Sequence, residues 1–212
     1  KIKIFRIVRD LHNSHFSNPL KRDKKIDDLD FNSVPPKKII VFVSRLVKLK
    51  FPDHFISVLS FLSEKKLLYK GILVGDGEMK NELIQMSKEL NIRDNVEFVG
   101  YRDQVWLSKL LAIADLFICP LKGRALAEAA LAGCSVVAYD IDWHDELIDS
   151  NQNGILVEFK NKQKLAEVSY KLLCDKELSK KFGNNLRNKA VDYFSINKLL
   201  DFENDSYKNL LI

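Results

Sequence analysis

The chain has 212 residues, of which 46% are apolar and 30% charged, enough for one globular core. Its formal net charge of +5 comes from residues 1–38, which hold ten Lys or Arg and five Asp or Glu, whereas the remainder carries 24 of each sign. The body of the chain therefore lacks the basic excess of a nucleic-acid-binding protein, and no apolar run approaches the ~20 residues of a membrane helix.

Residues 1–36 show no sustained periodicity. Residues 1–8 can form one strand, and residues 11–36 are polar, charged and rich in turn formers, ending in Pro35-Pro36. We expect residues 1–36 to be a linker or a residual N-terminal segment, and residues 37–212 to form the folded domain. The positive charge of this segment is compatible with contact to a membrane surface or an acidic partner, but we favour a solvated linker.

From residue 37 onward, buried strands alternate with helices, and the last part of the chain is helical. The expected strands are 39–46, 69–75, 95–100, 115–119, 135–139 and 154–157, and the expected helices are 52–64, 78–90, 104–113, 123–133, 146–150, 164–173, 177–193 and 196–211. Such alternation predicts an α/β fold with a parallel sheet, right-handed crossovers, helices on both faces and additional C-terminal helices.

The most informative stretch is ICPLKGRALAEAALAGCSVVAYD, residues 118–140. Gly123 opens the helix after an apolar strand, and Glu128 lies within its first turns. A helix N-terminus reached through glycine presents unpaired N–H groups to an anion such as phosphate. A carboxylate can accept hydrogen bonds from two hydroxyls of a sugar diol. Phosphate beside a diol indicates a nucleotide.

Two cations follow the first strand of the regular region. Arg45 and Lys50 lie five residues apart in its carboxyl-end loop, which is where parallel sheets bind ligands. Such a pair of cations can hold a diphosphate, although by itself it is usually a solvated surface. After the second strand, GDGEMK begins at Gly75 and has Lys80 where a dinucleotide fingerprint needs a third glycine, so Gly75 and Gly77 either turn the chain or contact a ligand.

These motifs resemble the "glycosyl transferases group 1" family of retaining enzymes, which are built from two Rossmann-like domains. The donor motif of that family has a glycine turn followed by Glu-Ala-Met-Ala-x-Gly. The residues on this pattern are Gly123, Glu128, Ala129, Ala132 and Gly133. Pro120 stands where the family has a first glutamate.

The family also has an Arg-Leu and a Lys-Gly after the first strand, matched here by Arg45-Leu46 and by Lys50, with Phe51 in place of the glycine. A Gly-x-Gly turn is matched by Gly75 and Gly77. The family's third-strand ending, whose loop lies against the nucleotide base, is matched by residues 98–101. The resemblance therefore implies that Tyr101 either stacks on the base or, as is more common at this position, acts through its backbone.

The resemblance runs from about residue 37 to the C-terminus and implies the C-terminal, donor-binding half of a GT-B glycosyltransferase. It implies transfer of a sugar from a nucleotide-diphosphate-sugar to an acceptor hydroxyl on a glycan, lipid or other molecule, with the N-terminal acceptor domain lying outside these residues. Arg45, Lys50 and the backbone near Gly123, Arg124 and Ala125 would hold the diphosphate. Glu128 would hold the ribose.

Two assignments stay open in the loop from Asp140 to Glu146, which replaces the family's Gly-Gly-x-Pro-Glu loop while Glu146 keeps the place of its glutamate. His144 is a candidate for assisting an acceptor or sugar hydroxyl, and a surface histidine is the equal alternative. The acidic residues of this loop have irregular spacing and the family has no metal-binding triad, so we expect no metal and no cofactor besides the substrate.

The alternatives to a transferase are a binding module that has lost catalysis, which Pro120 would favour, and a nucleotide-sugar epimerase, which needs further acid/base carboxylates. The three cysteines lack metal-ligand spacing and are expected to be free thiols in a reducing compartment. Without a signal peptide or membrane segment, we expect a cytoplasmic protein, with peripheral contact at the inner face of a membrane left open.

Overall fold

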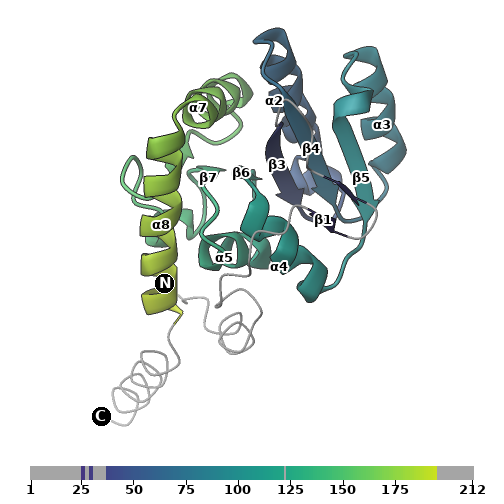
Figure 1. Ribbon diagram of the computed structural model, residues 1–212. Helices are drawn as coiled ribbons and strands as arrows, with labels where there is room; N and C mark the ends of the chain where they lie inside the picture. Colours follow the sequence, from purple (N-terminus) through teal and green to yellow (C-terminus); the bar gives the residue numbers. More distant parts are fainter. Residues whose placement is uncertain (1–24, 27–28, 31–36, 122, 195–212) are drawn as a thin grey trace.

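The computed structural model describes residues 25–26, 29–30, 37–121 and 123–194 (Figure 1). Within this part, six strands form one parallel sheet in the order β5-β4-β3-β6-β7-β8. The strands are β3 (Lys38–Val43), β4 (Tyr69–Val74), β5 (Val96–Gly100), β6 (Leu116–Cys119), β7 (Val136–Tyr139) and β8 (Ile155–Val157). This confirms the predicted Rossmann-like α/β fold.

Helices cover both faces of the sheet, as the continuous apolar strands require. They are α2 (Pro52–Glu64), α3 (Lys80–Glu89), α4 (Gln104–Ile113), α5 (Arg124–Leu131), α6 (His144–Leu147), α7 (Lys162–Cys174) and α8 (Lys176–Tyr193), with 3-10 turns η1 (Lys48–Lys50) and η2 (Arg93–Asn95). The side chains of Asp103, Asn161 and Asp175 cap α4, α7 and α8.

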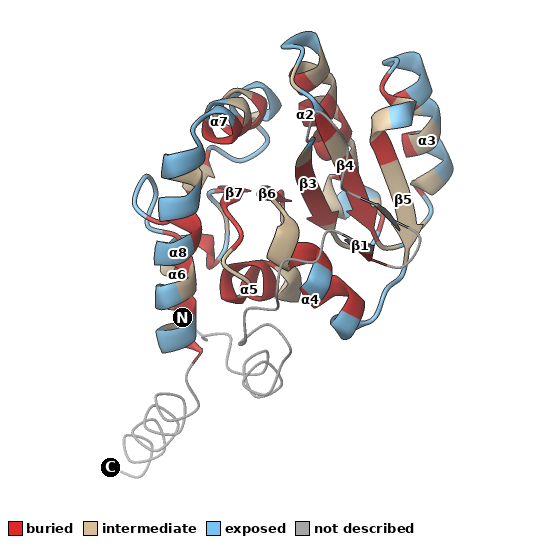
Figure 2. Ribbon diagram, viewed as in Figure 1, coloured by how far each residue is buried: buried red, intermediate tan, exposed pale blue. Residues whose placement is uncertain are grey.

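The core has two layers because alternate strand residues point to opposite faces. Figure 2 shows buried residues along β3 and β4, and buried and exposed residues alternating along α8. Ile40 and Phe42 of β3 pack with α2, α3 and α7, whereas Ile39 and Val41 pack with α4, α5 and α8. Helices therefore cover both faces of the sheet, less completely at the edge strand β5, where residues 97–100 are half-buried, and the ends of the strands are left for ligand binding.

The chain leaves β3 toward one edge of the sheet and leaves β6 toward the other. β3 lies between β4 and β6, and the connection from β3 through α2 leads to β4, whereas that from β6 through α5 leads to β7. The carboxyl ends of β3 and β6 therefore form the topological switch point at which open α/β sheets bind their ligands.

The observed helices and strands agree with the expected ones within a few residues, and α6 begins two residues before the predicted helix. The expected strand 1–8 and helix 196–211 lie outside the described residues. None of the helices in the described ranges has an apolar stretch long enough to cross a bilayer.

A small hairpin of β1 (Lys25–Ile26) and β2 (Leu29–Asp30) lies within the segment predicted as a linker. Ile26 is only 2% exposed and belongs to the core layer of α4 and α5. A simple linker does not describe this contact, and the boundary between residues 36 and 37 stays a prediction.

Candidate functional site

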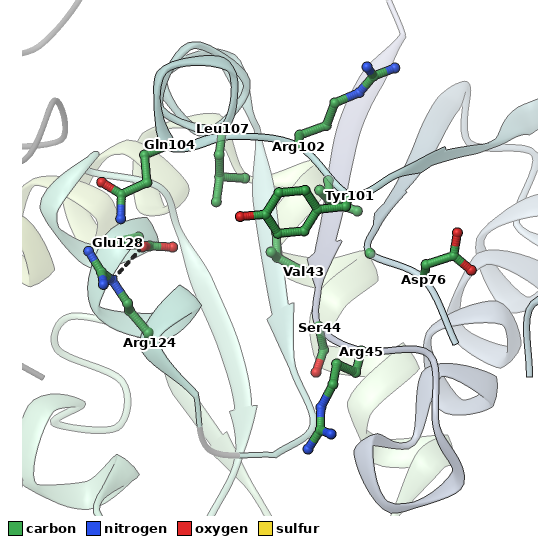
Figure 3. Close-up of a pocket in the computed structure, with 12 residues that line it drawn as sticks. Val43, Ser44, Arg45, Asp76, Tyr101, Arg102, Gln104, Leu107, Arg124 and Glu128 are labelled. Carbon is green, nitrogen blue, oxygen red and sulfur yellow. Dashed lines mark hydrogen bonds and ion pairs between the residues drawn. The ribbon is translucent and has the colours of Figure 1, made fainter. Parts of the chain in front are cut away.

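A cavity of about 460 Å³ opens at the switch point (Figure 3). We call it the switch-point pocket. Its floor is apolar and consists of Val43, Val74 and Leu107, and its polar lining consists of Ser44, Arg45, Gly75, Asp76, Tyr101, Arg102, Gln104, Arg124 and Glu128. These residues follow β3, β4 and β5 or lie in the first turns of α4 and α5, as the rule for parallel sheets predicts.

Glu128 is the buried charge of this pocket, and only 5% of the residue is exposed. Its Oε1 accepts a hydrogen bond of 2.9 Å from Nε of Arg124, one helical turn earlier in α5. Burial raises the pKa of Glu128, and the charge and hydrogen bond of Arg124 oppose that rise. The carboxylate thus lies at the pocket, and one of its oxygens is already hydrogen-bonded to Arg124.

The N-terminus of α5 is built for a ligand close to the backbone. Gly123 is the N-cap with extended dihedrals, and no side chain caps the helix. A Cβ added at Gly123 would have no atom within 4 Å. The open space above this helix start suits an anion that accepts hydrogen bonds from first-turn amides.

The two glycines after β4 adopt backbone conformations that leave no room for a side chain. Gly75 has φ +131°, and a Cβ there would lie 1.9 Å from the carbonyl oxygen of Ser44. Gly77 has φ +157°, and its Cβ would lie 2.5 Å from the carbonyl oxygen of Leu46. Gly75 also lines the pocket, while Gly77 does not. Both glycines let the loops after β3 and β4 approach each other.

Of the two predicted cations, the structure brings one to the pocket. Arg45 is exposed and lines the pocket. Lys50 ends η1, is half-buried and is outside the lining, although its charge is near enough to lower the pKa of the Cys119 thiol against the larger effect of burial. Gly123 and Ala125 are also outside the lining, at the adjacent helix start.

The loop after β5 supplies the aromatic wall. Tyr101 is 85% exposed, and its ring lies in the mouth of the pocket, between the side chains of Gln104 and Asp76 (Figure 3). The guanidinium of Arg102 lies over the ring of Trp106, at 5.1 Å from its centroid. This loop therefore presents a flat, solvent-accessible surface on which a planar ring can stack.

His144 lies away from the pocket. It is fully buried, its Nδ1 donates a 2.7 Å hydrogen bond to the Tyr139 carbonyl, and its Nε2 lies 3.9 Å from Sγ of Cys119. Burial lowers the pKa of His144, which keeps it neutral. The surface-histidine alternative is wrong, and the role on an acceptor hydroxyl has no support in this geometry. Glu146 accepts a hydrogen bond from Tyr193 of α8 and is likewise turned away.

The sequence thus predicted Arg45, Gly75, Tyr101, Arg124 and Glu128 in the pocket. It missed a second set, whose polar members are Ser44, Asp76, Arg102 and Gln104. Asp76 directly follows a predicted strand and Gln104 begins a predicted helix, so the rule for strand ends could have found these two. Ser44 falls within the predicted strand 39–46, which ends at Val43 in the structure, so its place at a strand end was hidden by the wrong boundary. Among the described residues, no three His, Cys, Asp or Glu side chains come together as a metal site.

The chain is similar in sequence to known glycosyltransferases. The family model described as "Glycosyl transferases group 1" matches residues 23–189. A curated relative, the poly(ribitol-phosphate) alpha-N-acetylglucosaminyltransferase of Staphylococcus aureus (strain COL), is 27% identical over 168 residues, which cover 78% of this chain and 34% of the relative. The N-acetyl-alpha-D-glucosaminyl L-malate synthase of Bacillus anthracis is 26% identical, covering 90% of this chain and 50% of that protein.

Solved structures share the fold. A mutant of S. aureus TarM in complex with Fondaparinux, alpha-GlcNAc-glycerol and UDP has a TM-score of 0.74 at 25% identity, covering 87% of this chain and 36% of that one. Anabaena HepE in complex with UDP-glucose has a TM-score of 0.72 at 25% identity, covering 82% and 49%. The chain spans about a third to a half of the length of the curated relatives it matches.

Proposed function

Because the chain belongs to the glycosyl transferases group 1 family, we propose that it binds the donor of a retaining glycosyltransferase, a nucleotide-diphosphate-sugar. One observation carries the proposal: Glu128 is buried at the start of α5, beside Arg124, in a pocket at the switch point of the sheet. A buried carboxylate next to an uncapped helix N-terminus suits a diol linked to a diphosphate.

The roles follow from the positions of the groups. Glu128 accepts hydrogen bonds from the ribose hydroxyls. Arg45, in the pocket lining, and the backbone at Gly123, Arg124 and Ala125, at the adjacent helix start, hold the diphosphate. Lys50 ends η1 outside the lining and adds its charge from a greater distance. Tyr101 stacks on the base. Apolar side chains together with convergent polar groups, one of them a buried charge, are expected of a small-molecule site.

Transfer would proceed by departure of the nucleoside diphosphate from the sugar carbon. The negative charge that develops on the leaving diphosphate is stabilised by Arg45 and by the amides and dipole of α5. An acceptor hydroxyl of a glycan, a lipid or another molecule attacks from a facing N-terminal domain. Closing the two domains excludes water and orients the reacting groups, so the complete protein is needed for transfer.

A module that binds without catalysis is the second candidate, favoured by Pro120, which is buried directly after β6 where the family has a glutamate. An epimerase is less well supported, since Glu128 and Asp76 are the carboxylates of the described pocket lining. Hydrolysis of a nucleotide-sugar by the complete protein, without an acceptor, separates the transferase from the binding module.

We expect UDP and UDP-glucose to bind this chain, since both occur in solved structures of the same fold. In calorimetric titration, Arg45→Ala should weaken UDP binding by roughly tenfold or more, because a charge-assisted hydrogen bond contributes about 1.5–3 kcal/mol. Lys109→Ala removes an exposed charge from α4, outside the pocket, and should leave the affinity unchanged. Equal losses in both variants would contradict the assignment of Arg45.

The same titration, repeated with a chelator, tests the expectation that the donor needs no metal. We expect an unchanged affinity, because Arg45 and the start of α5 supply positive charge to the diphosphate. Loss of binding with the chelator would mean that a divalent ion bridges protein and phosphate.

A further inference from the structure

Arg124 and Glu128 form an ion pair inside the switch-point pocket. The carboxylate side chain is 7% exposed and the guanidinium side chain 34% exposed, and Nε and Oε1 lie 2.9 Å apart. Both residues line the cavity, and both lie on the first turns of α5 (Figure 3). The pair thus reaches from the buried interior of the pocket to its solvent-exposed side.

The ion pair opposes the electrostatic cost of burying the Glu128 carboxylate. A carboxylate that binds a diol must stay ionised, because its neutral form turns one acceptor oxygen into a donor. Burial works against ionisation by raising the pKa of Glu128, and Arg124 opposes that rise. The other charged groups that line the pocket are Arg45, Asp76 and Arg102, from the loops after β3, β4 and β5. Arg124 is the charged partner in direct contact.

The ion pair also orients the carboxylate of Glu128. With Oε1 held by Arg124, the carboxylate plane is set relative to α5. Among the described residues, no hydrogen bond engages Oε2. That oxygen is therefore the acceptor left for a ligand.

We propose that Arg124 is a positioning residue of the donor site, which keeps Glu128 ionised and turned so that Oε2 receives the ribose diol. The inference rests on the proposed function, since it assumes that a ribose occupies this pocket. Arg124 itself stays paired with Glu128 when the donor binds. Its contribution to affinity therefore passes through the diol.

A direct contact between Arg124 and the diphosphate is the competing explanation, and ligand chemistry separates the two. UDP has both the diol and the diphosphate, whereas 2′,3′-dideoxy-UDP lacks the diol and keeps the base and the diphosphate. If Arg124 acts through Glu128, Arg124→Met should weaken UDP roughly tenfold and leave the dideoxy ligand almost unaffected. If Arg124 binds phosphate, the variant should weaken both ligands by the same factor.

The pH profile gives a second readout that a merely structural role would not move. For wild type, the ratio of UDP to dideoxy-UDP affinity should be constant between about pH 6 and 8. In Arg124→Met, that ratio should fall on acidification, by about tenfold for each pH unit below the pKa of Glu128. Taking the ratio cancels the titration of the diphosphate, which both ligands share. Arg124→Lys keeps the positive charge and should restore the flat profile.

A double-mutant cycle completes the test. In Glu128→Gln, which has no carboxylate to protect, Arg124→Met should cost little further UDP affinity and should introduce no pH dependence. Additive losses, or a UDP ratio in Arg124→Met as flat as in wild type, would overturn the positioning role. Failure of wild type to bind UDP would instead contradict the proposed function. Melting temperatures of the variants show whether each one is folded.

Discussion

Glu128 is charged in a place that disfavours its charge. Burial raises its pKa above the value near 4.5 of the unfolded chain, so the folded state binds this proton more tightly. The stability of the empty protein therefore falls as the pH rises through the window between these two values. A buried charge that lowers the stability of the empty protein is expected of a residue that binds a ligand, not of one that stabilises the fold.

We therefore predict that Glu128→Gln raises the melting temperature of the empty protein at pH 7 and weakens UDP binding by about tenfold or more. The gain in melting temperature should shrink toward pH 4.5, where Glu128 takes up a proton in both states. Thermal unfolding across pH, with and without UDP, measures both effects. Glu82→Gln, on the exposed side of α3, is the matched control and should change neither. A lower melting temperature for Glu128→Gln would mean that the ion pair stabilises the fold.

At the scale of elements, loops at the strand ends bring the site together, and their glycines have different tasks. Gly75 is required by the backbone, since a Cβ there meets the Ser44 carbonyl at 1.9 Å and φ is +131°. Gly123 is not required by the fold, because its dihedrals are extended and a Cβ would stand in open space. The missing side chain at Gly123 instead leaves room for a ligand at the N-terminus of α5.

Gly123→Ala should therefore leave the melting temperature of the empty chain nearly unchanged and weaken UDP by roughly tenfold or more, because the methyl group occupies the space expected for phosphate. Gly75→Ala should instead destabilise the fold by about 1–3 kcal/mol. Denaturant unfolding and UDP titration of both variants measure the contrast. If Gly123→Ala bound UDP like wild type, the diphosphate would not lie against this helix start.

At the scale of the whole molecule, the N-terminal hairpin contributes to the core. Ile26 is 2% exposed against the layer that contains α4. We predict that Ile26→Ala lowers the free energy of unfolding by about 2–5 kcal/mol, as for other buried aliphatic side chains. Val191→Ala, at an exposed position of α8, is the control and should have little effect. An unchanged stability for Ile26→Ala would support a free linker in this segment.

Local patterns in the sequence determined the elements of this domain and their class. Strands such as β3 are continuous β-branched and aromatic runs, and α2 has apolar residues at helical spacing. Both patterns can be recognised in the sequence without knowing which other segments the element packs against. The glycine before α5 and the carboxylate within it are close in sequence, so their joint chemistry was predictable. The parallel sheet follows from such patterns alone, and so does the prediction that Glu128 is a binding residue.

Only the tertiary structure decided which side chains share the pocket. Tyr101, Arg45 and Glu128 follow different strands, and the order of those strands in the sheet brings them together. Lys50 and His144 lie in the expected loops, yet one is outside the lining and the other is enclosed beside Cys119. The direction of a loop side chain depends on packing against residues distant in sequence, and periodicity carries no information about that packing.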